Sequence, residues 1–182
     1  MKATRIPLMM LLLALAPALA FAQKTSYDFD KGANFGGFHT YALKEGTPAG
    51  NSLVDKRLVE AIQTQLAARG LKPDAANPDL FVVYHVAVDK KQELTGYTTG
   101  YGGYGGYGWR WGGGMSTTNV QVNEILVGTL IIDMASAASK ELVWRGMGVK
   151  EIDPQAKPDK RDKNINNVVT KILKNYPPKV KS

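Results

Sequence analysis

Residues 120–149 read VQVNEILVGTLIIDMASAASKELVWRGMGV, and this stretch decides the fold. Its two halves, 120–134 and 142–149, are rich in β-branched and other apolar residues, and Asp133–Lys140 between them is small and polar enough to turn the chain. Such a pattern is typical of two paired strands, so we expect a long β-hairpin. Glu124 breaks the polar alternation of the first half, which predicts a bulge near this residue.

The segments that precede this hairpin predict a further strand and a helix. Residues Leu80–Val88 are apolar on both alternating faces except at His85, which favours a strand in the middle of a sheet. Residues Leu53–Leu66 repeat their apolar positions at helical spacing. Residues 51 and 52, Asn and Ser, can each cap this helix, and Gly70 lies just beyond its end.

The beginning of the domain has the pattern of two short strands. Tyr27–Asp30 alternates aromatic and acidic residues with the period of a strand, and Phe38–Leu43 is a second apolar and aromatic run. A glycine pair at 36–37 separates them, so we expect the two strands to be joined by a turn.

The end of the domain has the pattern of a helix. Pro154 and Pro158 interrupt a polar linker, and apolar residues at helical spacing follow from Ile165 to Tyr176, before Pro177. The predicted order is strand, strand, helix, strand, strand, strand, helix. Consecutive strands favour an α+β domain with a largely antiparallel sheet of about five strands and two helices packed on one face.

Residues 1–22 have the three parts of a cleavable signal peptide. Lys2 and Arg5 give a positive start, an apolar stretch follows, and Ala20-Phe21-Ala22 is a small-x-small cleavage site. A membrane anchor would need about 20 apolar residues, and this run is shorter. We therefore expect cleavage between Ala22 and Gln23, and a single periplasmic or secreted domain over residues 23–182.

The composition of the 182-residue chain limits the classes of partner. Its net charge is +7, but acidic residues interrupt the basic ones from Lys150 to Lys181, which indicates a solvated basic face rather than a nucleic-acid surface. The chain has no cysteine, so packing alone must hold the domain together, and a lipid-modified amino-terminal cysteine is excluded. With no second apolar span, we expect the mature chain to be soluble, without a transmembrane segment.

The segment 96–114, GYTTGYGGYGGYGWRWGGG, contains 10 glycines in 19 residues and cannot form a regular core element. We expect a mobile loop that projects from the end of a hairpin. Its aromatic and cationic side chains are the candidate binding residues, because flat rings bind sugars, peptides or proteins: Tyr97, Tyr101, Tyr104, Tyr107, Trp109, Arg110 and Trp111. The alternative is a low-complexity insertion whose aromatic side chains fold back on the domain.

The sequence predicts no catalytic residue, metal site or cofactor. Its two histidines, His39 and His85, are fewer than the three or four ligands that zinc takes, and no short ligand spacing is visible. A nucleophile motif of the Gly-x-Ser-x-Gly type is missing. Asp28 and Asp30 could act as a carboxylate pair, but on a strand near the amino terminus they are interpreted as its solvated side. Trp144 is interpreted as a core aromatic.

Several short motifs together resemble the bacterial envelope family called domain of unknown function 4136. The motifs are Tyr27-Asp28-Phe29-Asp30, Phe38-His39-Thr40-Tyr41, Asn77-Pro78-Asp79-Leu80, Gly128-Thr129-Leu130-Ile131-Ile132-Asp133, Lys140-Glu141-Leu142-Val143-Trp144-Arg145-Gly146 and the closing Val168–Pro178. The resemblance covers nearly all of residues 24–178, and the 128–146 hairpin is its most specific part. It implies an envelope location and glycine-aromatic inserts between central strands, and it supplies no catalytic residues.

Three functional hypotheses follow. The first is a non-enzymatic periplasmic module that binds another envelope component, a protein or a glycan, through residues 96–114. The second is a small-molecule or metal-binding protein that uses the sheet face around His85, Tyr84 and Trp144. The third is a hydrolase of unrecognised type.

Overall fold

The computed structural model describes residues 24–98 and 118–179. The elements in chain order are β1 (Lys24–Phe29), the 3₁₀ turn η1 (Phe35–Gly37), β2 (Thr40–Thr47), α1 (Ser52–Ala67), β3 (Lys72–Pro73), β4 (Leu80–Thr98), β5 (Thr118–Ser136), β6 (Leu142–Ile152) and α2 (Pro158–Leu173).

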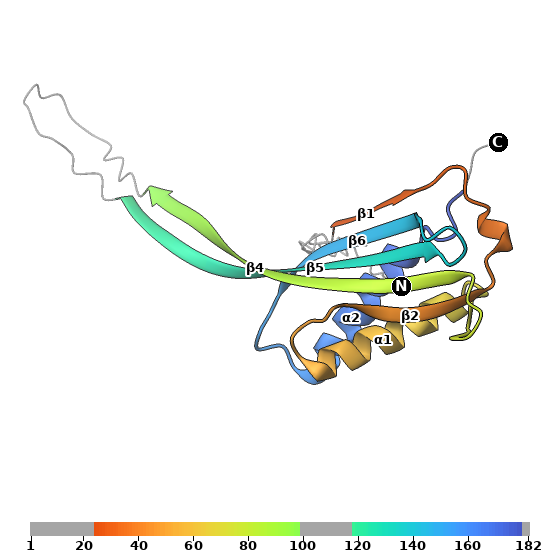
Figure 1. Ribbon diagram of the computed structural model, residues 1–182. Helices are drawn as coiled ribbons and strands as arrows, with labels where there is room; N and C mark the ends of the chain where they lie inside the picture. Colours follow the sequence, from red (N-terminus) through yellow and green to blue (C-terminus); the bar gives the residue numbers. More distant parts are fainter. Residues whose placement is uncertain (1–23, 99–117, 180–182) are drawn as a thin grey trace, which may run out of the picture.

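The six strands form one sheet in the order β1-β6-β5-β4-β2-β3, and both helices lie on one of its faces (Figure 1). The α+β class is confirmed. The largely antiparallel sheet of about five strands is corrected to a mixed sheet of six, because β2 pairs in parallel with β4 and with β3. The parallel pair arises because α1 lies between β2 and β4 in sequence and returns the chain to the end of the sheet where β2 began.

The predicted turn between the first two strands is wrong. β1 pairs with β6, and β2 pairs with β4, on opposite sides of the antiparallel β6-β5-β4 unit. The chain between β1 and β2 crosses the end of the core, where Phe35 of η1 is buried. Its ring packs edge-on against Phe29, Phe38 and Tyr176, with ring centroids 6.0 Å apart in each pair. Burial of Phe35 therefore holds the crossing segment against the core.

The predicted hairpin is present as β5 and β6, and β5 continues to Ser136 before the turn. The predicted bulge near Glu124 is wrong, because Glu124 is in regular register with Gln92 and the shift lies between Met134 and Ala135. Glu124 is exposed. At this point β5 has extended beyond β6 and beyond the two helices, so no helix covers either of its faces (Figure 1). An alternation of polar and apolar residues is therefore not required there.

Both helices form, with one boundary corrected. In α1, the predicted cap is Asn51, whose Oδ1 accepts hydrogen bonds from the backbone N–H of Leu53 and Val54. α2 begins at Pro158, seven residues before the predicted Ile165, because proline at the first helical position loses no intrahelical hydrogen bond.

The core lies between the helices and one face of the sheet. Its fully buried side chains come from both helices and from β2, β4, β5 and β6: Tyr41, Ile62, Leu66, Leu80, Val82, Ile132, Met134, Trp144, Val169, Ile172 and Leu173. α2 approaches β6 closely because Gly146 has no side chain on the helix-facing side, where a Cβ would lie 2.5 Å from Cγ2 of Ile172. Neither α1 nor α2 is long and apolar enough to cross a membrane.

Candidate functional site

β4 and β5 are much longer than the rest of the sheet. Each has 19 residues, and they pair in register from Leu80 with Ser136 to Thr98 with Thr118. β6 pairs with β5 only from Leu126 onward, so residues 91–98 and 118–125 pair with each other alone. We call these two segments the ribbon. Figure 1 shows it projecting past the sheet. At a rise of about 3.4 Å per residue, its eight residue pairs span on the order of 25 Å.

The predicted binding residues belong to the ribbon or to the segment that its two strands flank. Tyr97 lies on β4, paired with Asn119, because β4 continues through Thr98. The other six candidates lie outside the described residues: Tyr101, Tyr104, Tyr107, Trp109, Arg110 and Trp111.

The residues of the second hypothesis do not form one site. Tyr84 and Trp144 both face the helices, and Trp144 is fully buried with its ring edge-on to Tyr176, 5.7 Å between centroids. His85 follows Tyr84 on β4 and therefore points to the opposite face of the sheet. Its Nδ1 accepts a hydrogen bond from the backbone N–H of Thr47 at 3.2 Å and lies 3.0 Å from the Thr47 hydroxyl.

Asp28 and Asp30 hold nearby backbone in place. Asp28 accepts a hydrogen bond from the N–H of Phe29 at 2.9 Å, and Asp30 accepts one from Gly32 at 2.8 Å. Over residues 24–98 and 118–179, no group of three or more histidine, aspartate and glutamate side chains is arranged to hold a metal ion.

Asp79, from the Asn-Pro-Asp-Leu motif, fixes the start of β2. One carboxylate oxygen accepts hydrogen bonds from the backbone N–H of His39 at 2.8 Å and of Thr40 at 2.9 Å, and from the Thr40 hydroxyl at 2.9 Å. These bonds hold the pKa of the Asp79 carboxyl below its usual value, the backbone bond from His39 most strongly. The motif therefore has a structural role.

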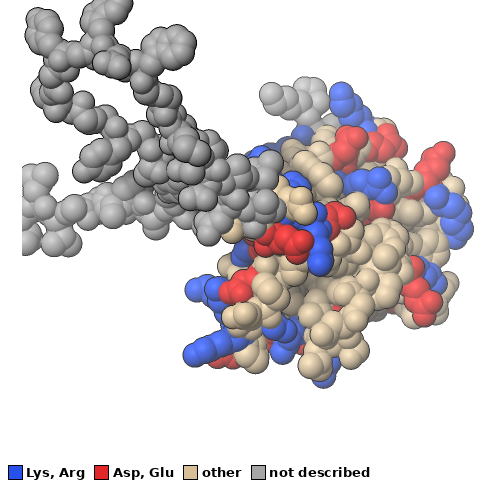
Figure 2. All heavy atoms as spheres, turned by 90° about the vertical axis from the view of Figure 1, so that its left-hand side faces the viewer, with Lys and Arg blue, Asp and Glu red and all other residues tan. Residues whose placement is uncertain are grey.

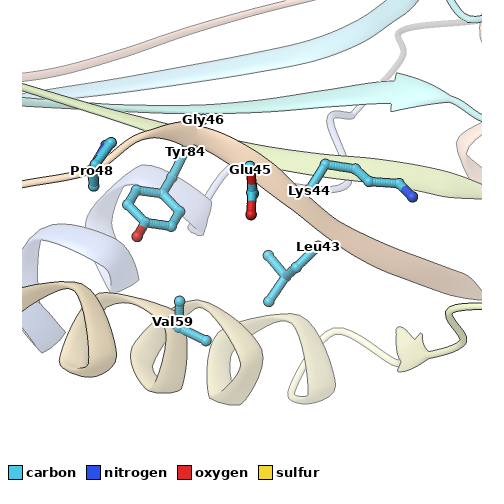
Figure 3. A pocket seen from close by; sticks show the side chains of 7 residues that line it. All are labelled: Leu43, Lys44, Glu45, Gly46, Pro48, Val59 and Tyr84. Atoms are coloured by element: carbon cyan, nitrogen blue, oxygen red, sulfur yellow. The ribbon is translucent and has the colours of Figure 1, made fainter. Parts of the chain in front are cut away.

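A first hollow, the edge groove, lies between β2 and α1 with a volume of about 470 Å³. Figure 3 shows Tyr84 and Leu43 pointing from the strands toward Val59 on α1. The Tyr84 hydroxyl donates a hydrogen bond to Oδ1 of Asp55 at 3.0 Å. Burial of the ring and this bond raise the pKa of Tyr84 to about 12, so the phenol stays protonated at neutral pH.

A second hollow, the helix groove, has a volume of about 390 Å³ and lies between the two helices and the sheet, at the end where the ribbon begins. Its floor comes from β4, β5 and β6, and its walls come from α1, α2 and the loop before α2. The side chains that line it are mostly apolar: Ala49, Val54, Leu58, Val86, Val88, Ile152, Ala156, Ile165 and Val168. Lys150, Arg161 and Asn164 are polar residues of its lining.

Sequence reasoning missed the helix groove, although β6 contains a signal for it. Positions 144, 146 and 148 face the helices, and the period of two places Lys150 on the same face. A lysine on the strand face that packs against the core indicates either a buried partner for its charge or an opening in the core. This signal can be interpreted only when two things are known together: which residues of β6 face the helices, and where α2 lies.

Charged side chains of both signs are interspersed on the face from which the ribbon projects. Figure 2 shows lysine and arginine side chains next to aspartate and glutamate on this face, without one continuous basic area. Two of the close pairs join neighbouring elements, Arg57 with Asp162 and Lys160 with Asp153. Both signs of charge are thus mixed over the part of this face that the structure describes (Figure 2).

Over the residues that the structure describes, the mixed sheet, the two helices on one face and the projecting ribbon form an α+β fold. The chain belongs to the family described as domain of unknown function DUF4136, whose model matches residues 25–178. The expected family is thus confirmed. No curated protein matches the sequence.

Solved structures show a similar fold at low identity. A PDZ domain protein from Parabacteroides distasonis has a TM-score of 0.55 and 19% identity over 86% of this chain, and the match spans 35% of that protein's length. The PelC dodecamer from Paraburkholderia phytofirmans has a TM-score of 0.49 and 10% identity, over 84% of this chain and 95% of that one. A putative neuraminyllactose-binding hemagglutinin homolog from Helicobacter pylori has a TM-score of 0.37 and 13% identity, over 79% and 88%. The likeness to the PDZ domain protein, at 19% identity, indicates the fold alone.

Proposed function

We propose that this protein is an exported, non-enzymatic binding module of the bacterial envelope. Residues 1–22 direct export and are removed between Ala22 and Gln23, and the mature domain works in the periplasm or outside the cell. It binds another envelope component, a protein or a glycan, through the glycine and aromatic segment that the ribbon presents. The observation that carries the proposal is the ribbon itself.

The ribbon adds length to the domain without adding to its core. A two-stranded hairpin is at best marginally stable in water by itself, so the ribbon contributes little to holding the domain together. Four of its five described side chains, those of Lys91, Gln92, Asn123 and Glu124, are exposed and polar, as in a solvated arm, and Ile125 at its base is half-buried. An arm of this kind is useful for reach, because a partner at its tip does not have to contact the domain.

The sequence places suitable side chains at the end of this arm. Tyrosine and tryptophan offer large flat surfaces at low entropic cost, and glycine lets the backbone adapt to a partner. Arg110 adds a cation beside two tryptophans. These residue types stack on sugar rings and on other aromatic groups, which supports a glycan or a protein as the partner.

Site-specific photocrosslinking in living cells tests the proposal. A photoreactive residue is placed at Tyr104 or Tyr107, and at Lys56 or Glu60, exposed positions on α1, as matched controls. We expect both tip positions to give the same crosslinked partner and the α1 positions to lack it. The same products from all four positions, or none from the tip, would contradict the proposal.

Export is tested separately on the same cells. Fractionation is expected to place the chain in the periplasm or medium, and amino-terminal sequencing is expected to start at Gln23. A cytoplasmic chain that starts at Met1 would overturn the envelope location.

A further inference from the structure

The helix groove is an opening in the apolar core. Val54 and Leu58 of α1 face Ile165 and Val168 of α2 across it, above the sheet. Its volume of about 390 Å³ lies within the range of about 300–1,000 Å³ that is usual for small-molecule sites. At its lining, the side chains of Val88 and Ile152 are 50% and 39% exposed, so apolar surface continues from the interior to solvent.

Lys150 is a charged group of the groove that has no carboxylate partner. Its Nζ donates a hydrogen bond to the neutral Oδ1 of Asn164, and no described carboxylate lies within 4.0 Å of it. Burial, followed by repulsion from Lys171 and Lys160, lowers the pKa of Lys150 below its usual value. The attraction of an anion in the groove would offset both effects.

The other charged groups near the groove have partners or point elsewhere. Glu151 also lines the groove, but the strand's period of two directs its side chain to the opposite face of the sheet from Lys150. Asp153 pairs with Lys160 at 3.0 Å, and Arg161 donates hydrogen bonds to the backbone carbonyls of Ala156 and Pro154. Asp162 pairs with Arg57 between the two helices. An anionic ligand could therefore engage Lys150 without breaking an ion pair, whereas Arg161 would have to give up its hydrogen bonds to backbone carbonyls.

We propose that the helix groove binds a single-chain amphiphile with an anionic head. The alkyl chain lies between α1 and α2 on Val54, Leu58, Ile165 and Val168, and the head accepts hydrogen bonds from the Lys150 ammonium. A fatty acid and a lysophospholipid share this chemistry. The site is separate from the ribbon tip, so the proposal does not depend on the proposed function.

Calorimetric titration of the purified mature chain tests the site. The probes are decanoate, decyl phosphate and neutral 1-decanol, each below its critical micelle concentration.

Two variants, each with a control, test the two parts of the site. Lys150→Met removes the charge and keeps the side-chain length, with Lys56→Met on the exposed side of α1 as its control. Val54→Trp fills the groove, with Leu53→Trp as its control, because Leu53 is 62% exposed and does not line the groove. Thermal melts confirm that each variant is folded.

We expect saturable binding of both anions, one per chain. Lys150→Met should weaken the affinity for both anions by about tenfold or more, because one charge-assisted hydrogen bond is lost. The affinity for 1-decanol should not change. Lys150→Arg should restore most of the affinity, Val54→Trp should weaken all three probes, and both controls should bind like the wild type. Tighter binding of decanoate points to a fatty acid as the source, and tighter binding of decyl phosphate to a lysophospholipid.

The proposal would be overturned if the wild type bound neither anion saturably, or if Lys150→Met and Lys56→Met bound the anions with equal affinity. Unchanged binding by a folded Val54→Trp variant would overturn it as well. Binding that persists after the ribbon is removed separates this site from the tip, and loss of binding on that removal would also contradict it.

Discussion

Arg145 on β6 lies directly across from Asp133 on β5 and donates two hydrogen bonds to its carboxylate, Nε to Oδ1 and Nη2 to Oδ2, both at 2.6 Å. The Asp133 side chain is 12% exposed, whereas that of Arg145 is 51% exposed. A carboxylate this buried needs its partner, because an unpaired charge loses its hydration without compensation. The pair therefore joins β5 and β6 next to the turn of the hairpin.

Arg145→Met should lower the free energy of unfolding by about 1–3 kcal/mol, because it leaves the buried acceptor without its partner. Urea denaturation measures this loss. Lys90→Met breaks the exposed Lys90–Glu124 pair and should cost at most about 1 kcal/mol. The double variant Asp133→Asn/Arg145→Met should lose less than the sum of its single changes. Additive losses would show that the two side chains do not depend on each other.

Gly146→Ala should destabilise the domain by about 1–3 kcal/mol, because the core has no room for the added methyl group. A Cβ at this position would lie 2.3 Å from Cη2 of Trp144 and 2.5 Å from Cγ2 of Ile172. Gly36→Ala is the control, since its nearest atom would be the Asn34 side chain at 3.5 Å. Thermal melts of the two variants compare the effects, and equal melting temperatures would contradict the close packing of α2 on β6.

Asp79→Asn should reduce stability at neutral pH by about 1–2 kcal/mol, since a carboxylate accepts the three hydrogen bonds at the start of β2 better than an amide does. The folded state lowers the pKa of Asp79 below the usual 3.8. Its contribution is therefore fully present above 3.8 and is lost as the pH falls from there through the lowered pKa of the folded state. Urea denaturation at pH 7 and pH 3 should show a smaller difference between wild type and variant at pH 3. The control Asp89→Asn, at an exposed position, should behave like the wild type at both.

Tyr84→Phe should remove one of the late steps in an alkaline titration of the tyrosines. The folded state raises the pKa of Tyr84 to about 12, mainly by burial of the ring and then by its bond to Asp55. Because the folded pKa is raised from 10.0, the stability contributed by Tyr84 is present below pH 10 and is lost as the pH rises toward 12. Ultraviolet absorbance follows the ionisation. Tyr27→Phe, at an exposed ring, should leave the step in place, and a Tyr84→Phe titration identical to that of the wild type would show that Tyr84 is not held protonated.

The elements could be predicted from local patterns, whereas the partners of the edge strands could not. The apolar run of β4 and the turn before β6 are properties of neighbouring residues, so the hairpin and the central strand were found. β1 pairs with β6 and not with β2, because the segment between β1 and β2 crosses the end of the core, where Phe35 is buried. No local pattern in the sequence reveals this crossing. The parallel β2–β4 pair was predictable in principle, because a helix between two strands favours a crossover.

The candidate sites divide in the same way. The glycine and aromatic segment is visible in the composition of the sequence. The ribbon that flanks it is not, because β4 and β5 extend beyond β2 and β6, and only the pairing of β2 and β6 determines where the ribbon begins. The helix groove brings together α1, α2 and three strands, so no short segment predicts it. Motif residues such as Asp79 could not be assigned a role until their hydrogen-bond partners, about 40 positions away, were known.

Shortening the ribbon should leave the domain intact. A variant in which an Asn-Gly turn replaces residues 92–124 keeps every pairing of β2, β4, β5 and β6 in the sheet and removes residues that pair only with each other. Its melting temperature should fall by no more than a few degrees, because the ribbon buries none of the core residues.

Hydrogen exchange of the full chain provides the matching measurement. Amides of residues 91–98 and 118–125 should exchange much faster than those of 80–86 and 130–134, because two uncovered strands open without unfolding the domain. Equal protection of both sets, or unfolding of the shortened variant, would mean that the ribbon is part of the cooperative core. An arm that opens separately can instead change its conformation on meeting a partner while α1, α2 and the sheet stay folded, and this is what a tip-binding module requires.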